Sequence, residues 1–129
     1  MSSIFTKIIN GELPAYKVAE NDDFLAFLDI NPLAKGHTLV IPKKEVDYIF
    51  DLDDDLLGAF HVFAKQVAKK IEQVVPCERI GVAVIGLEVP HAHIHLVPIN
   101  HVGDIDFSKP KLDLPKETFE ELSNAIKNS

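Results

Sequence analysis

The chain has 129 residues, of which 47% are hydrophobic and 26% are charged, and it contains a single cysteine. This length and composition fit one domain around one core rather than a disordered chain, and one cysteine can form neither a disulfide framework nor a cysteine zinc cluster within the chain. The formal net charge of -7 argues against a nucleic acid as the main partner, because proteins that bind nucleic acids usually present a basic surface.

The N-terminal stretch SIFTKIINGELP predicts a short helix. Ser3 can cap its start, and Gly11 followed by Pro14 is typical of a helix end. The apolar side of this helix is formed by residues at helical spacing, namely Ile4, Phe5, Ile8 and Ile9. No long apolar run is present here, so we expect neither a signal peptide nor a membrane span, and we expect a cytoplasmic location.

Three short strands are predicted next, over residues 16–18, 24–30 and 37–42. The turn ENDD separates the first two strands and indicates a hairpin, and the loop NPLAKG leads into the third. All three strands are rich in β-branched or aromatic residues, which is typical of a buried sheet.

A long helix is predicted over residues 51–75, because acidic residues crowd its start and apolar residues recur at helical spacing. Two strands, over 79–86 and 92–99, follow and are joined through the segment GLEVPH, and a last helix starts near residue 115. Five strands, mostly in hairpins, together with one long helix indicate an α+β fold. We expect a mainly antiparallel five-stranded sheet with the long helix packed on it.

The segment PHAHIHLVP contains three of the six histidines at alternate positions, His91, His93 and His95. Residues two apart on a strand point to the same face of a sheet, so the three imidazoles are predicted to share one face. Ala92, Ile94 and Leu96 then share the opposite face and suit a core covered by a helix.

Three interpretations of this alternation are open. The histidines can be solvated residues on an exposed sheet face, or they can hold a metal ion with His37 as a further ligand. Zinc needs imidazole nitrogens about 2.0–2.1 Å away, whereas His91 and His95 are about 13 Å apart along a strand. The third interpretation is a catalytic strand that handles phosphate.

The phosphate interpretation fits the chemistry of neutral imidazole, which is a nucleophile near neutral pH. Attack by a ring nitrogen on phosphorus gives a labile phosphoramidate and divides one hard step into two easier ones. The middle residue, His93, is the best-placed attacker. His91 and His95 flank it and can donate hydrogen bonds to phosphate oxygens or protonate a leaving group.

The sequence around the triad resembles the histidine triad family, whose signature is His-x-His-x-His followed by two apolar residues. SIFTKIINGELPAYKVAENDDFLAFLDINPLAKGHTLVIPKK is similar to the N-terminal half of the family, and GLEVPHAHIHLVP is similar to its C-terminal core. The resemblance covers about residues 3–98, whereas the tail and helix over 99–129 carry little family signal. It implies a single domain of this type over residues 1–129.

Family members are nucleotide hydrolases or transferases, and most are homodimers whose sheets join into one. The resemblance implies that His93 attacks the α-phosphorus of a nucleotide, that His91 and His95 contact phosphate, and that His37 supports the triad. It also implies that Asp29 accepts hydrogen bonds from the ribose hydroxyls. The residues implied to line the base pocket are Ile4, Phe5, Ile8 and Ile30.

Some positions depart from the family pattern. Leu87 stands where members often have glutamine, and Glu88 stands where some have serine. A carboxylate beside a phosphate is repulsive, so we expect the backbone N–H of Val89, rather than the Glu88 side chain, to contact phosphate. The N-terminal cysteines that bind structural zinc in some members are absent, and we expect no metal and no cofactor. His95 favours the hydrolase branch over the nucleotidyltransferase branch, which has glutamine there.

Three functions therefore remain open. The first is a hydrolase that cleaves at the α-phosphate of a nucleotide through a nucleotidyl-histidine intermediate, with a purine nucleoside phosphoramidate favoured over a dinucleoside polyphosphate. The second is a nucleotide-binding module with weak catalysis. The third is a metal-dependent hydrolase that uses His37 and the triad as ligands.

Overall fold

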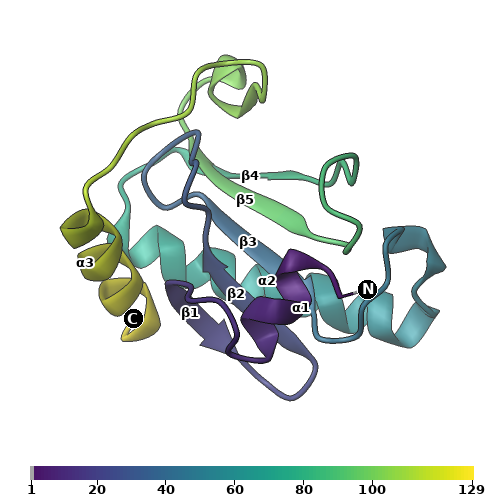
Figure 1. Cartoon of the computed structure of the whole chain (residues 1–129). Coiled ribbons are helices and arrows are strands. Elements are labelled where there is room, and N and C mark those ends of the chain that lie inside the picture. The colour runs from purple at the N-terminus through teal and green to yellow at the C-terminus, as the bar shows by residue number, and fades with distance from the viewer. Residues whose placement is uncertain (1) are drawn as a thin grey trace.

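The computed structural model describes residues 2–129, and its elements are shown in Figure 1. The helices are α1 (Ile4–Ile9), α2 (Asp54–Val74) and α3 (Lys116–Lys127). The strands are β1 (Lys17–Glu20), β2 (Phe24–Leu28), β3 (Thr38–Pro42), β4 (Arg79–Ala83) and β5 (Ile94–Ile99). Short 3-10 turns cover Ile49–Asp51 and Val102–Ile105.

The five strands form one sheet in the order β1-β2-β3-β5-β4, and every neighbouring pair is antiparallel. This confirms the predicted α+β fold with a five-stranded antiparallel sheet. Strand β5 lies between β3 and β4, with Leu39 opposite His95 and Val40 opposite Ile94. The histidine-rich segment therefore leads directly into the interior of the sheet, whereas β4 forms one edge.

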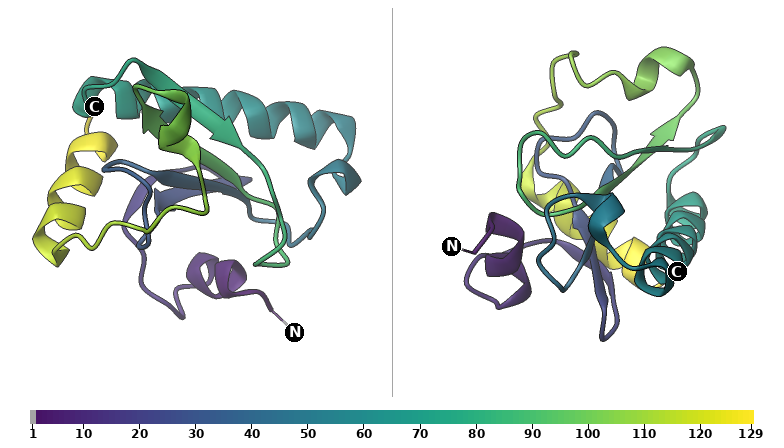
Figure 2. Two further views of the ribbon diagram at one scale, coloured as in Figure 1. Left: turned by 90° about the horizontal axis from the view of Figure 1, so that it is seen from above. Right: turned by 90° about the vertical axis from the view of Figure 1, so that its right-hand side faces the viewer.

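The two faces of the sheet are covered by different helices, with α2 on one side and the short α1 on the other (Figure 2). On β2, Phe24, Ala26 and Leu28 belong to the core under α2, whereas Leu25 and Phe27 pack with α1. Side chains alternate between faces along a strand, so β2 is buried on both sides. For this reason the sequence of β2 has no polar face.

Helix α2 has the apolar stripe that its sequence predicts, and the structure adds a cap at its start. The side chain of Asp53 accepts a hydrogen bond from the backbone N–H of Leu56 at 2.8 Å and so caps the first turn. The buried stripe faces the sheet and consists of Phe60, Phe63, Ala64, Val67 and Ile71. Across residues 2–129, no helix has the length and apolar character needed to cross a membrane. The cytoplasmic location stays a prediction.

The C-terminal helix joins the same core. Phe119 and Ile126 of α3 are buried with the α2 side of the sheet, and the ring of Phe119 stacks on Tyr16 at a centroid distance of 5.2 Å. Helix α3 contacts both α2 and β1, so it closes the end of the core beside the first strand.

The structure shortens several predicted strands. The strand predicted over 92–99 begins only at Ile94, because the N–H of Ala92 donates to the carbonyl of Val46 in a loop instead of to a neighbouring strand. The strand predicted over 79–86 ends at Ala83, before a turn in which Gly86 has a φ of 79°. The strand predicted over 24–30 ends at Leu28, and the one over 37–42 begins at Thr38.

Candidate active site

The three alternating histidines lie on one side of the sheet, although only His95 belongs to strand β5. Ala92, Ile94 and Leu96 are buried in the core under α2, as the alternation predicts. On the opposite side, the ring of Phe5 in α1 makes edge contacts with the rings of His91 and His93, at centroid distances of 5.8 and 5.1 Å. The rings of His93 and His95 are 5.0 Å apart. The rings of His93 and His95 are thus direct neighbours, and the Phe5 ring contacts both His91 and His93.

One hydrogen bond defines which ring nitrogen of His93 carries the hydrogen. Its Nδ1 lies 2.8 Å from the carbonyl oxygen of His91, and a carbonyl only accepts, so Nδ1 must carry the hydrogen. In the neutral ring the lone pair is then on Nε2. The ring is 6% exposed, so its orientation is fixed by packing as well as by this hydrogen bond. The result is a ring of fixed orientation whose Nε2 can accept a hydrogen bond or share its lone pair.

His37 and His95 form a second ordered pair. The Nδ1 of His37 accepts a hydrogen bond from the backbone N–H of Leu33 at 3.0 Å, so the proton of the neutral ring is on Nε2. That Nε2–H lies 3.0 Å from Nδ1 of His95 and donates to it. His95 must therefore carry its own proton on Nε2, and the pair presents an N–H donor next to the His93 ring.

The loop between β2 and β3 is folded so that it positions His37. The N–H of His37 donates to the carbonyl of Ala34, and the N–H of Asp29 donates to the carbonyl of His37. Gly36 adopts a φ of +90°, and a Cβ at this position would lie 2.9 Å from a methyl group of Val75. A glycine is therefore required here for two reasons, backbone conformation and space.

Burial keeps these histidines neutral. Desolvation lowers the pKa of His37 to about 4, and the nearby Lys111 ammonium acts in the same direction. Desolvation, followed by the neighbouring His37 and His93, lowers the pKa of His95 to about 3. Burial also lowers the pKa of His91. At neutral pH His37, His91 and His95 are therefore uncharged, so each of these rings has one donor and one acceptor nitrogen.

Both ring nitrogens of His91 are bonded to other parts of the protein. Nε2 lies 2.8 Å from the carbonyl oxygen of Pro42, and Nδ1 lies 2.7 Å from the hydroxyl oxygen of Ser3. The residue has no exposed surface. This differs from the expectation that His91 contacts phosphate, because neither ring nitrogen is directed at an open site.

Asp29 lies at the end of β2, beside His37. One carboxylate oxygen is 3.6 Å from Nε2 of His37, and the other accepts a hydrogen bond from the N–H of Asn31 at 2.9 Å. Burial raises the pKa of Asp29, while the Asn31 N–H and the positive charge of Lys111 act against this shift. Asp29 is therefore a partly buried acceptor close to the histidine pair.

The residues expected around a base have two different environments. Phe5 and Ile8 are buried against the sheet, whereas Ile4 is 52% exposed and Ile30 is 63% exposed. Val89 is half-buried against the cluster that contains Phe5 and Ile8. Exposed apolar side chains next to buried ones form a surface against which a planar group can pack.

An apolar cleft of about 330 Å³ opens beside His93. Its other walls include Tyr48, Phe50, Ile85 and Leu87. Leu87 is 89% exposed in this chain, and Glu88 beside it is also exposed. His93 therefore lines open space, while its neighbours His91 and His37 are enclosed.

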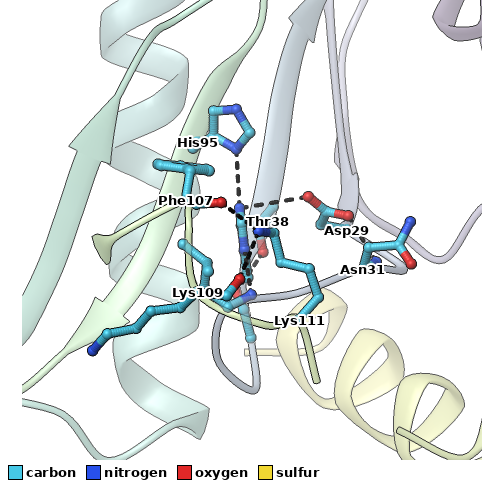
Figure 3. Close-up of polar contacts among 10 residues, drawn as sticks. Asp29, Asn31, Thr38, His95, Phe107, Lys109 and Lys111 are labelled. Carbon is cyan, nitrogen blue, oxygen red and sulfur yellow. Dashed lines mark hydrogen bonds and ion pairs between the residues drawn. The ribbon is translucent and has the colours of Figure 1, made fainter. Parts of the chain in front are cut away.

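The C-terminal segment contributes two residues that the sequence did not indicate. The ring of Phe107 packs edge-on against His95 at 4.6 Å and against His37 at 6.1 Å (Figure 3). The ammonium of Lys111 is held by the carbonyls of Phe107 and Lys109 at 2.6 and 3.0 Å. The segment is anchored by the N–H of Leu112, which donates to the carbonyl of Pro32. No sequence signal linked residues this far beyond the triad to the site.

Asp29, His37 and His95 also have the spacing of a metal site. Their potential ligand atoms all lie within 4.8 Å of one another. Nε2 of His37 nevertheless carries a proton, because Nδ1 already accepts from the Leu33 N–H. Binding a cation through Nε2 would require an anionic ring or the loss of that backbone hydrogen bond. The residues therefore fit a chain of hydrogen bonds better than a metal.

Comparisons with known proteins agree with this site. A family model described as the HIT domain matches residues 10–102, a range that contains His37 and the triad. An uncharacterized HIT-like protein of Borreliella burgdorferi is 40% identical over 95% of this chain and 94% of its own length. An adenosine 5'-monophosphoramidase of Schizosaccharomyces pombe is 35% identical over 98% of this chain and its full length, 100%. A crystal structure of a Hit-like protein involved in cell-cycle regulation from Bartonella henselae superposes with a TM-score of 0.84 and 32% identity, covering 98% of this chain and 95% of that one.

The neutral histidine pair predicts a specific pH dependence. His37 and His95 should show no titration by NMR between pH 7.5 and about 5.5, because their pKa values are about 4 and about 3. Unfolded histidines take up protons near pH 6.5, so the unfolded state binds more protons as the pH falls. The contribution of this pair to stability is therefore complete above pH 6.5 and declines as the pH drops toward 4. Titration of either ring near pH 6.5 would show that burial does not hold the pair neutral.

Proposed function

Because the chain belongs to the HIT domain family, we propose that it is a nucleotide hydrolase that cleaves at the α-phosphate through a nucleotidyl-histidine intermediate. The observation that carries this proposal is the hydrogen bond from Nδ1 of His93 to the carbonyl of His91, which leaves the lone pair on Nε2 of a residue that lines an open cleft. A purine nucleoside phosphoramidate is the proposed substrate class. The similarity to a protein named as an adenosine 5'-monophosphoramidase supports this choice.

In the first proposed step, Nε2 of His93 attacks the α-phosphorus and a bond between nitrogen and phosphorus forms. The bond from phosphorus to the amine of the substrate breaks, and the amine leaves with its electron pair and takes a proton from water. The nucleotidyl-imidazole is cationic, and its Nδ1–H remains bonded to the carbonyl of His91. This carbonyl stabilises the positive ring of the intermediate.

In the second step, water attacks the same phosphorus, the bond to Nε2 breaks, and the nucleoside monophosphate leaves. His93 regains its lone pair, and the proton lost by water passes to solvent. The Nε2–H of His95 is the proposed donor to a non-bridging phosphate oxygen, and the contact with His37, which fixes the proton of His95 on that nitrogen, supports this role. Such a donor is already aligned before charge develops in the transition state.

The nucleoside is proposed to lie on the side of the site formed by Asp29 and α1. The Asp29 carboxylate is an acceptor suited to a pair of ribose hydroxyls, and the base would be covered by Ile4, Phe5, Ile8 and Ile30. The backbone N–H of Val89 is the proposed phosphate donor in the preceding loop. The side chain of Glu88 is exposed, and the proposal assigns it no contact with the phosphate.

The metal-dependent alternative draws on the convergence of Asp29, His37 and His95. We propose instead that this cluster works without an ion, because the Leu33 N–H keeps the His37 proton on the nitrogen that a metal would need. The binding-module alternative is motivated by Leu87 and Glu88. Both alternatives differ from the hydrolase in what a turnover experiment would show.

A homodimer with a joined sheet is proposed as the assembly. Strand β4 is an edge strand, and Val82 in it is 60% exposed in the single chain. Val84 and Ile85, which directly follow the strand, are also exposed apolar residues. An exposed apolar edge is a template for pairing with another strand, and a second copy of β4 supplies the partner.

Turnover of adenosine phosphoramidate tests the proposed reaction. The wild-type protein should release the nucleoside monophosphate over many turnovers, and His93→Ala should reduce kcat by at least about a thousandfold, because the nucleophile is lost. His61→Ala, an exposed histidine of α2, is a matched control that should retain activity. A chelator should leave the wild-type rate unchanged.

Different results select the alternatives. Activity that disappears in chelator and returns with added zinc would support the metal-dependent hydrolase. Tight binding of nucleotides with negligible turnover would support the binding module. Undiminished turnover by His93→Ala would contradict the covalent mechanism.

The role of Asp29 can be isolated with a matched pair of substrates. Asp29→Ala should raise KM for the ribose substrate about tenfold, because hydrogen bonds to a charged acceptor are lost. The wild-type protein should prefer the ribose substrate to its 2′-deoxy analogue, and most of this preference should disappear in Asp29→Ala. An equal effect of Asp29→Ala on both substrates would show that the carboxylate does not read the ribose.

The assembly predicts a mass of two chains in sedimentation equilibrium. Replacing Val82 by lysine should shift the protein toward the monomer, because a charge is placed on the proposed pairing edge. A single-chain mass for the wild-type protein at micromolar concentration would contradict the dimer.

A further inference from the structure

A polar cluster at the start of α1 connects the N-terminus to the triad. It consists of Ser3, Thr6, Glu45 and His91, and we call these four residues the clamp. The backbone N–H of Ser3 and the hydroxyl of Thr6 each donate to the same carboxylate oxygen of Glu45, at 2.6 Å. The hydroxyl oxygen of Ser3 lies 2.7 Å from Nδ1 of His91. Segments 42 and 88 residues apart along the chain are thus tied together.

The distances in the clamp favour one order of its protons, because the competing contact of the Ser3 hydroxyl with the Thr6 hydroxyl oxygen is longer, at 3.3 Å. Nε2 of His91 faces the carbonyl of Pro42, so it carries the hydrogen, and Nδ1 must accept. The Thr6 hydroxyl is committed to Glu45 at 2.6 Å and is 3.4 Å from Nδ1, so the donor to His91 is the hydroxyl of Ser3. Ser3 in turn accepts from the N–H of Thr6 at 3.0 Å.

Glu45 is the final acceptor in this series of hydrogen bonds. Its side chain is exposed, and the donors from Ser3 and Thr6 hold its pKa below the ordinary value, so it stays a carboxylate at neutral pH. It directs the Thr6 hydroxyl away from Ser3 and fixes the backbone of Ser3. Without it, the Ser3 hydroxyl would lose the arrangement that aims it at His91.

The clamp acts on the chemistry through one further hydrogen bond. His91 is fixed at both ring nitrogens, and its carbonyl oxygen is the acceptor that holds the proton of His93 on Nδ1. We propose that Glu45, acting through Ser3 and Thr6, is a positioning residue that fixes His91 and thereby the reactive tautomer of His93. This inference rests on the proposed function only where activity is the readout.

Paired substitutions at Glu45 separate positioning from bulk stability. Glu45→Ala removes the acceptor, whereas Glu45→Gln keeps a carbonyl oxygen that can accept from both donors. Thr6→Val removes one donor with little change in shape. Asp22→Ala removes an exposed carboxylate from the turn between β1 and β2 and is the charge-matched control. None of these substitutions touches a residue of the triad.

We expect kcat for adenosine phosphoramidate to fall about fivefold to tenfold in Glu45→Ala and Thr6→Val, with KM within about twofold. Glu45→Gln and Asp22→Ala should stay within about twofold of the wild type. In ¹⁵N NMR spectra of histidine-labelled protein, the Nδ1 resonance of His91 should move in Glu45→Ala. The His93 ring should change from one tautomer to a mixture.

Two outcomes would overturn the inference. Unchanged tautomers of His91 and His93 in Glu45→Ala would do so whether or not the protein is active. A rise in KM together with a lower melting temperature, with intact tautomers, would show that Glu45 only seats helix α1. Failure of the proposed function is a separate result, because it would appear as absent wild-type turnover or as an active His93→Ala variant.

Discussion

The hydrogen bond from Nδ1–H of His93 to the carbonyl of His91 spans 2.8 Å within a three-residue segment. It selects which nitrogen of the ring has the lone pair, and therefore which atom can attack. Because the ring is 6% exposed, water does not compete readily for that proton. The proposed reaction, its nucleophile and the stabilisation of its intermediate all depend on this one contact.

The rest of the fold supplies the conditions for that contact. Burial of Ala92, Ile94 and Leu96 in the α2 core leaves the alternating histidines on the other side, where Phe5 of α1 covers His91 and His93. Two chains of oriented hydrogen bonds then approach the triad from different directions. One begins at Glu45 and reaches His91, and the other begins at the Leu33 N–H and reaches His95 through His37. Burial keeps His37, His91 and His95 neutral, so the donor and acceptor pattern of each ring is unambiguous.

The parts of this arrangement that were predictable from sequence are those that depend on periodicity. Alternation predicted the shared face of the triad and the opposite, apolar face of Ala92, Ile94 and Leu96. Helical spacing predicted α2 and the capped α1. The clamp was not predictable, because Ser3, Glu45 and His91 are distant in sequence and each has an ordinary local role, as a helix cap, a loop acid or a histidine just before a strand. Phe107 and Lys111 were missed for the same reason. The start of β5 was misplaced because the Ala92 N–H bonds to a loop, which no pattern in the strand reveals.

The central claim is that Nε2 of His93 becomes covalently attached to phosphorus during turnover. Rapid quenching of the protein with adenosine phosphoramidate into alkali, which preserves phosphoramidates, followed by peptide mapping and ³¹P NMR, tests it directly. We expect an adenylyl group on Nε2 of His93 that appears before the product and decays at the rate of turnover. An adduct on Nδ1 or on His95, or turnover with no adduct at any time, would contradict the claim.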